Sequence, residues 1–229
     1  MLEQEKYSAQ QNNPEVIRGD GLTPSERYLA SLAERSFLNL WSYPNPFRNQ
    51  QQRGKGDGKE LCDLLVVCGR HIIIFSEKSI AWPGGDLEVA WARWAKRAIY
   101  KAAEQAKGAE RWITEHPDRI FLAPDCRNPF PLDIPPAEHR VLHRVVVARG
   151  AADACRKHFR GSSGSLVINP AIEGKRHWAA QAGPLRPFEI GDLDPSGSFF
   201  HVLNEHSLEV VMRELDTIRD FTDYLEAIS

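Results

Sequence analysis

The first regular pattern along the chain is a helical stripe that follows a polar arm. Residues 1–22 lack any apolar period, and we expect them to form a largely disordered arm. Thr23, Pro24 and Glu26 then supply an N-cap, a proline at the first helical position and the acid of a capping box. The apolar positions behind them are Leu29, Leu32, Ala33, Phe37 and Leu40. Their spacing predicts a helix over 23–41 with this face toward the core.

Two short apolar runs then predict a β-hairpin. Leu64–Val67 and Ile72–Phe75 are rich in β-branched and bulky residues, are too short for helices, and flank a Cys-Gly-Arg turn. Because both faces of each run are apolar, we expect two adjacent strands in the middle of a covered sheet. Asp63 begins one strand and Lys78 follows the other, which predicts a carboxylate and an ammonium group together at one rim. Charges in such a place are costly unless they bind something.

The remaining pattern alternates helices and strands. A long helix is expected over 87–115, and one polar residue, Gln105, lies within its apolar stripe. A strand over 141–148 and a short helix over 151–158 follow. We expect further strands at 166–168, 188–190 and 199–203, and a final amphipathic helix over 208–225 capped by Ser207. The sequence thus predicts a single α/β domain over 23–229, with a core over 23–150 and a C-terminal elaboration over 151–229.

Composition narrows the class of protein. The chain has 229 residues, of which 42% are hydrophobic and 26% charged, values typical of a globular protein. No apolar run approaches the roughly 20 residues that a membrane span needs, and the polar N-terminus is not a signal peptide. We therefore expect a cytoplasmic protein with no membrane partner.

Charge argues against one mode of nucleic-acid binding but leaves another. A formal net charge of −2 does not suit a protein that coats nucleic acid through a global basic field. A local basic segment nevertheless precedes the hairpin, in a Gly- and Gln-rich loop. Its members, Arg48, Arg53, Lys55 and Lys59, are candidates for contacts with phosphate groups.

Cysteine and histidine chemistry is not prominent in the sequence. The four cysteines form no Cys-x-x-Cys pair, and two of them lie in or beside the predicted buried strands, so reduced thiols are expected. Six histidines are scattered between residues 139 and 206 without metal-ligand spacing, and we expect them to be surface or packing residues.

The motifs of the hairpin resemble those of a known superfamily. Glu60-Leu61-Cys62-Asp63-Leu64-Leu65 and Phe75-Ser76-Glu77-Lys78 are similar to the paired motifs of the restriction-endonuclease-like, or PD-(D/E)XK, nucleases. The likeness is greatest to the NERD and Mrr-like branch and covers about residues 23–150. It implies a mixed central sheet flanked by helices and a metal-dependent nuclease that acts on DNA. Bacterial defence against phage and DNA processing are associations of that family. Besides DNA, a second copy of the chain or a partner protein of a larger system is a further expected partner.

The resemblance also assigns roles to individual residues. Asp63 corresponds to the central metal ligand, with Glu34 and Glu77 supplying further carboxylates to Mg²⁺ or Mn²⁺. Lys78 would handle water or phosphate, and Gln105 would orient the nucleophile or the lysine. Such a set is needed because phosphodiester hydrolysis requires an activated water and relief of charge on the phosphorus.

One position departs from the motif. The second acid normally lies two residues before the lysine, where this chain has Ser76. Glu77 would point to the opposite face of a regular strand, unless a β-bulge or the strand's end turns it into the site. Alternatively, Glu60 or Glu34 replaces the missing acid, or the protein is a catalytically inactive module that binds nucleic acid or a protein partner. These alternatives predict different positions for the same carboxylates.

Overall fold

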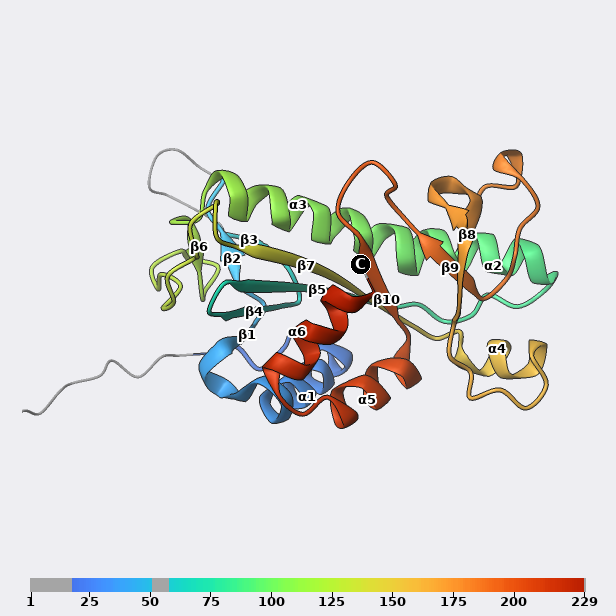
Figure 1. The fold of residues 1–229 in the computed structure, drawn as a ribbon, viewed down its shortest axis with the longest axis horizontal. Helices are drawn as coiled ribbons and strands as arrows, with labels where there is room; N and C mark the ends of the chain where they lie inside the picture. The colour runs from blue at the N-terminus through green and yellow to red at the C-terminus, as the bar shows by residue number, and fades with distance from the viewer. Residues whose placement is uncertain (1–17, 51–57, 229) are drawn as a thin grey trace, which may run out of the picture.

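The chain folds around a mixed five-stranded β-sheet that lies between two helical layers (Figure 1). The computed structural model describes residues 18–50 and 58–228. The strand order is β1-β4-β5-β7-β10, antiparallel from β1 to β5 and parallel from β5 to β10. The elements of this sheet and its helical layers are α1 (Pro24–Trp41), β1 (Ser42–Pro44), β4 (Leu64–Cys68), β5 (His71–Ser79), α2 (Leu87–Ala95), η1 (Lys96–Tyr100), α3 (Lys101–Glu115), β7 (Val141–Arg149), β10 (Phe200–Leu203), α5 (Glu205–Glu214) and α6 (Ile218–Ala227). The predicted α/β class and mixed, helix-flanked sheet are confirmed.

The central hairpin forms as the apolar runs predict, and the second strand is longer than expected. β4 and β5 pair from Leu64 with Phe75 to Cys68 with His71. β5 continues through Lys78 to Ser79 because β7 pairs with it along its whole length, in an unbroken parallel register. The residues at the end of β5 therefore alternate between the two faces of the sheet as in any regular strand.

Each face of the sheet has its own apolar core. Leu65, Ile72 and Ile74 face the helical run α2-η1-α3, whereas Ile73 and Phe75 face α1, α5 and α6. The long helix predicted over 87–115 is present with a π-helical turn, η1, in its middle. A π-helical turn contains an additional residue, which shifts the face that the following turn presents. Such turns are often found at functional sites.

The first helix is confirmed together with its capping box, apart from its last turn. Glu26 N donates to Thr23 Oγ1, and the Glu26 carboxylate accepts from Thr23 N. Leu40, which the stripe predicts to be buried, is 63% exposed. Leu38 has φ 58°, outside the helical region, and this kink turns the end of α1 away from the core.

The final helix of the sequence prediction is two helices. Leu215 ends α5, and Thr217 caps α6 by accepting a hydrogen bond from Asp220 N at 3.1 Å. Ser207 is not the cap of the first helix; Asn204 is, and Ser207 is the third residue that completes its capping box. Two N-caps within one amphipathic pattern explain the break, since each starts a helix of its own.

Smaller elements surround the sheet. Residues 152–158 form a short helix as predicted, and the strands predicted at 166–168 and 188–190 pair with each other in parallel, outside the main sheet. Their bounds are β2 (Phe47–Arg48), β3 (Lys59–Glu60), β6 (Ile120–Phe121), α4 (Ala152–His158), β8 (Val167–Glu173), η2 (Gly174–His177), η3 (Ala180–Ala182) and β9 (Glu189–Asp192). β3-β2-β6 forms a small sheet beside one end of the central one.

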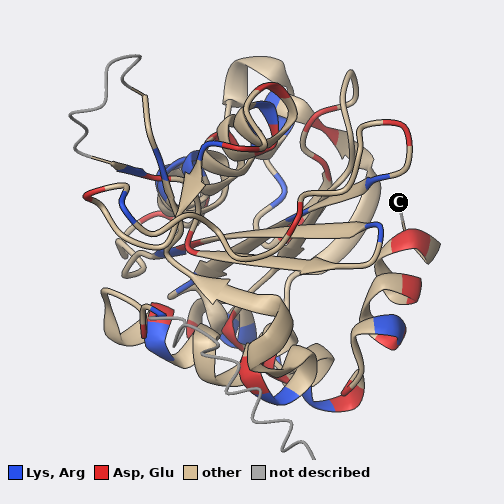
Figure 2. Cartoon of the chain, turned by 90° about the vertical axis from the view of Figure 1, so that its left-hand side faces the viewer, with Lys and Arg blue, Asp and Glu red and all other residues tan. Residues whose placement is uncertain are grey.

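Charged residues follow this layering. Lysine, arginine, aspartate and glutamate lie mostly on helices, loops and strand ends (Figure 2). Residues 1–17 of the expected arm lie outside the described residues, and Arg18 lies over the Tyr43 ring at 4.5 Å. Among the helices that the structure describes, none combines the length and apolar character needed to cross a membrane. The four cysteines are free thiols, as predicted.

Candidate active site

Four of the residues singled out from the sequence meet at one end of the hairpin. Asp63 immediately precedes β4, Lys78 lies near the end of β5, Glu60 ends β3, and Gln105 projects from α3. Asp63 N donates to Phe75 O, which continues the β4–β5 ladder and sets Asp63 opposite Ser76. The alternation along β5 then brings Lys78 to the α3 side, where Gln105 lies.

Direct contacts link these side chains. Lys78 Nζ donates to Gln105 Oε1 at 2.6 Å and lies 3.9 Å from Asp63 Oδ2. Gln105 Nε2 reaches Glu60 Oε1 at 3.5 Å, at the limit of hydrogen bonding. The amide therefore bridges the lysine and a carboxylate, as expected of a residue that orients both. The structure brings Gln105 to Lys78, and its predicted role in orienting the nucleophile or the lysine stays a prediction.

The carboxylates in this group are held close together in a partly buried place. Burial, followed by the Asp63 charge beside it, raises the pKa of Glu60 to about 7. Burial also raises the pKa of Asp63, although Lys78 and the Glu77 N–H, which donates to Asp63 Oδ2 at 2.7 Å, oppose the rise. Two carboxyl groups in this state favour a shared proton or a shared cation over two bare charges.

Glu77 does not join them, which corrects its predicted place as a metal ligand. Its side chain is 1% exposed and faces the other side of β5, where Glu77 Oε1 accepts from Arg149 Nε at 3.0 Å. Burial raises the pKa of Glu77, and the neighbouring Ser25 and Arg149 oppose that rise. The register between β5 and β7 has no bulge that could turn the side chain round. Glu77 contacts this site through its backbone: its N–H donates to Asp63 Oδ2, and its carbonyl oxygen accepts from Lys78 Nζ at 2.9 Å.

Ser76 occupies the position that an acid has in the motif. It is fully buried, and its Oγ has no hydrogen-bond partner among the residues that the structure describes. A buried hydroxyl without a partner is unusual and indicates a place where water or a ligand completes the site. Glu60 supplies the second carboxylate near Asp63, which is one of the alternatives that the sequence left open.

The helix acid is a different residue from the one predicted. Glu34 is exposed on α1, and no contact links it to Asp63, Glu60 or Lys78 within the described parts of the chain. Glu26, in the first turn of α1, is near enough for its charge to raise the pKa of both Glu60 and Asp63. The sequence identified Glu26 only as a capping residue, because its position at a helix start gives a sufficient local reason for an acid.

Asn45 ties that helix start to the hairpin. Asn45 Nδ2 donates to Glu26 Oε2 at 3.0 Å, and Asn45 N donates to Asp63 O at 3.0 Å. Beside this link, a cleft of about 500 Å³ is lined by the first turn of α1, Glu77 and Lys78. Lys78 thus lines this cleft on one side, and on the other its ammonium group contacts Gln105 and lies near the Asp63 carboxylate.

The basic residues predicted to contact phosphate groups are only partly described. Arg53 and Lys55 lie outside the described residues. Arg48 is half-buried with its guanidinium 5.4 Å from the centre of the Trp112 ring, and burial lowers its pKa. Lys59, which pairs with Arg48 across β2 and β3, is exposed. Of the two, Lys59 is the one whose charge is free to meet a ligand.

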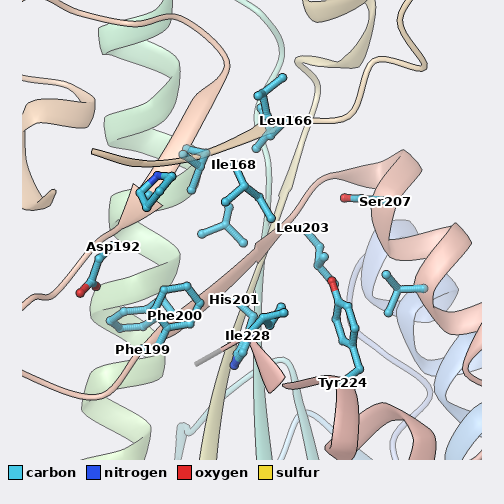
Figure 3. A pocket seen from close by; sticks show the side chains of 16 residues that line it. Leu166, Ile168, Asp192, Phe199, Phe200, His201, Leu203, Ser207, Tyr224 and Ile228 are labelled. Atoms are coloured by element: carbon cyan, nitrogen blue, oxygen red, sulfur yellow. The ribbon is translucent and has the colours of Figure 1, made fainter. Parts of the chain in front are cut away.

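An apolar pocket elsewhere offers binding volume without comparable chemistry (Figure 3). It holds about 360 Å³ between β8, β10 and the last helix, and Leu166, Ile168, Phe199, Leu203 and Tyr224 are among its lining residues. Asp192, His201 and Ser207 contribute its polar side chains. They form no linked carboxylate, lysine and amide set like that around Asp63.

The donor atoms around Asp63 fit Mg²⁺ or Mn²⁺. Glu60 and Asp63 offer carboxylate oxygens, Ser76 offers a buried hydroxyl, and hard oxygen donors are those that such cations prefer. Comparisons of the chain with protein-family models, curated proteins and solved structures give no match, so the function has to be argued from this geometry.

Proposed function

We propose that the protein is a metal-dependent nuclease that hydrolyses phosphodiester bonds in DNA, with Asp63 and Lys78 at its centre. The observation that carries the proposal is the connected set Glu60, Gln105, Lys78 and Asp63, assembled from three separate stretches of the chain. A structural ion pair between Asp63 and Lys78 would need neither the Gln105 bridge nor a second carboxylate with a raised pKa.

The element order supports a restriction-endonuclease-like core. The chain forms first a helix and an antiparallel hairpin, then a crossover helix and a strand parallel to the second strand of that hairpin. The motif residues lie at one end of the hairpin. We assign α1, β4, β5, α3 and β7 to that core. The strands and helices after Arg149 are then an elaboration on it.

Each residue has a defined task in this proposal. Asp63 and Glu60 hold the cation, whose chemistry is to activate a water near neutral pH and to relieve charge on the phosphate. Lys78 places its positive charge beside the scissile phosphate or binds the attacking water. Gln105 accepts from Lys78 Nζ at 2.6 Å and so keeps the ammonium directed at the carboxylates. Ser76 Oγ offers a hydrogen bond to a water molecule bound among these residues.

The test is cleavage of linear, supercoiled and single-stranded DNA by the purified protein with Mg²⁺, Mn²⁺ or EDTA. We expect cutting only with a divalent cation, and its loss in Asp63→Asn and Lys78→Ala. Glu34→Gln is the matched control, since it removes an exposed acid of the same first helix. Cutting that persists in both site variants would assign the activity to another site or to a contaminant.

The alternative function is a binding module without catalysis. It is favoured by the absence of an acid at Ser76, where the related motif has a metal ligand. DNA affinity that survives Asp63→Asn, with no cutting under any metal condition, would support it against the nuclease. A phosphate-contacting role of Lys59 belongs to both functions and is tested by the salt dependence of DNA binding.

A further inference from the structure

A second polar cluster lies at the opposite end of β5. His71 begins β5, His143 lies near the start of β7 and Glu226 lies on α6. β5 and β7 pair His71 with Val141 and Ile73 with His143, so the two histidines are offset by two residues and face the same side of the sheet. His201, on β10, continues this diagonal because it pairs with Val145.

The geometry points to a binding site for a divalent transition-metal cation, of which Zn²⁺ is the test case, formed by His71, His143 and Glu226. Their ligand atoms all lie within 4.8 Å of one another. His71 Nδ1 is 3.2 Å from His143 Nε2 and 3.8 Å from Glu226 Oε1. Tetrahedral Zn²⁺ with bonds of about 2.0–2.1 Å needs neighbouring donor atoms about 3.3 Å apart.

The environment suits a neutral imidazole donor. His143 is 4% exposed, and burial followed by the neighbouring His71 lowers its pKa to about 4. Burial therefore favours the neutral imidazole, which is the form of histidine that binds a metal. Glu226 supplies the one negative charge of the set, and its side chain is 40% exposed.

A cleft gives the cluster access to solvent. It holds about 560 Å³ and is lined by His143, His201, Glu226 and Asp192, among others. Two imidazoles and one carboxylate make up the protein ligands of several zinc sites that keep a further position for water or a small ligand. His201 also lines the apolar pocket of Figure 3, so the cleft and that pocket adjoin at this residue.

Arg70 stands in the way of the metal and makes the site testable. Its Nη2 lies 3.2 Å from Glu226 Oε1, and its Nε donates to His71 Nε2 at 3.4 Å. Because His71 Nε2 accepts this hydrogen bond, the single proton of a neutral His71 is on Nδ1, which is the atom that would bind the metal. The cation must therefore displace both that proton and the guanidinium. Arg70 is 58% exposed, so its side chain can move away without disturbing the core.

This site is independent of the proposed nuclease and differs in its donors. The carboxylate group around Asp63 presents oxygen atoms, whereas this cluster presents two nitrogens and one oxygen. A metal bound here would join α6 to β5 and β7. We therefore expect it to stabilise the C-terminal helix against unfolding.

The experiment is Zn²⁺ titration of the metal-stripped full chain by calorimetry, in an Asp63→Asn background that weakens the carboxylate site. We expect a single tight site that Glu226→Gln and His143→Gln each weaken by roughly tenfold or more. Arg70→Ala should tighten it by up to about fivefold, because only an exposed ion pair is removed. His139→Ala, which removes an exposed loop histidine, is the matched control and should change nothing.

Two outcomes would overturn the site. One is no Zn²⁺ binding by the folded protein, and the other is binding that neither Glu226→Gln nor Arg70→Ala alters. Both of those variants change exposed side chains, so the test does not depend on whether the buried His143 variant folds. Co²⁺ in place of Zn²⁺ gives a second readout, since tetrahedral coordination by nitrogen produces a visible absorption band that His143→Gln should abolish.

Discussion

The two ends of β5 carry two polar clusters that differ in chemistry and in the side of the sheet they face. Lys78 faces α3 and meets carboxylates and an amide, whereas His71 faces α6 and meets an imidazole and one carboxylate. Lys78 lies seven positions after His71 along the strand, a distance of roughly 23 Å. One strand thus carries residues of two polar clusters. The alternation of its side chains places the clusters on opposite faces of the sheet, and the length of the strand keeps them far apart.

The comparison also explains why one cluster was visible in the sequence and the other was not. Asp63 and Lys78 lie at the open end of the same hairpin, so the pairing of its two strands brings them close together. His71 and His143 are brought together because β5 pairs in parallel with β7, and a long helix separates these two strands in the sequence.

The largest effect is expected at the lysine. Lys78→Met keeps much of the side-chain length but removes the charge beside Asp63 and the hydrogen bond to Gln105. We expect DNA cleavage to fall by roughly 10²–10³-fold, the range seen when one preorganised charge-stabilising group is lost. Initial rates under Mg²⁺ measure it. Zn²⁺ affinity at the histidine cluster should not change, and a parallel loss there would show that the two ends are coupled.

The next largest effect is on stability. Glu77→Ala leaves Arg149 without its buried partner on the α1 side of β5, and removing one member of such a pair destabilises by about 3 kcal/mol. Urea unfolding measures the change. Cleavage per folded molecule should remain, since the Glu77 N–H that supports Asp63 belongs to the backbone. A variant that is as stable as the parent yet inactive would return Glu77 to the metal site.

A third prediction concerns pH. The pKa of Glu60 rises from an ordinary value of 4.5 to about 7 in the folded protein. Between these values the folded state retains a proton that the unfolded chain releases, so without metal the contribution of Glu60 to the free energy of unfolding should fall as pH rises through this window. Glu60→Gln should remove that contribution. Added Mg²⁺ should oppose it, because a bound cation stabilises the ionised carboxyl.

Unfolding curves at several pH values, with and without Mg²⁺, provide the measurement. The histidine cluster contributes the opposite sign: burial lowers the pKa of His143 from 6.5 to about 4, so between these values the unfolded chain binds the proton and the free energy of unfolding rises with pH. The Glu60 contribution is therefore the difference between the parent and Glu60→Gln. A slope that persists unchanged in Glu60→Gln would mean that another group titrates, and the assignment of Glu60 as second acid would lose its support.

The smallest effect is expected at the first helix. Glu26→Gln keeps a capping residue but removes a charge that raises the pKa of Glu60 and Asp63. We expect Mg²⁺ affinity to fall a few-fold and stability to change little. Glu34→Gln should change neither, and isothermal titration of both variants compares them directly. An effect of Glu34 larger than that of Glu26 would contradict the geometry of α1.

Much of the fold followed from local patterns. The capping box before α1, the apolar hairpin and the stripe of the long helix all describe interactions within a few residues of each other. The errors arose where a local rule met a competing one. Leu40 obeys the helical period but lies beyond the kink at Leu38, and the final amphipathic pattern contains a second N-cap at Thr217.

The candidate site was predicted to a similar extent. Asp63, Lys78 and Gln105 were brought together as expected, since a hairpin end and a helix stripe position them. Glu34 was predicted to be the first-helix acid and Glu26 only a capping residue, since the sequence does not say which turn of this helix packs near Asp63. That choice depends on Asn45, which links the start of α1 to the hairpin.

By itself, the sequence determined a helix-flanked α/β domain and a carboxylate, lysine and glutamine group at one end of its hairpin. These features rest on side-chain periodicity and short-range pairing, which the order of residues contains. Tertiary structure alone decided that Glu77 forms an ion pair with Arg149 away from the site, that Glu60 lies beside Asp63, and that two histidines distant in the sequence lie close to Glu226. Those outcomes depend on the register between strands and on how helices pack over them, and residues far apart in the sequence set both.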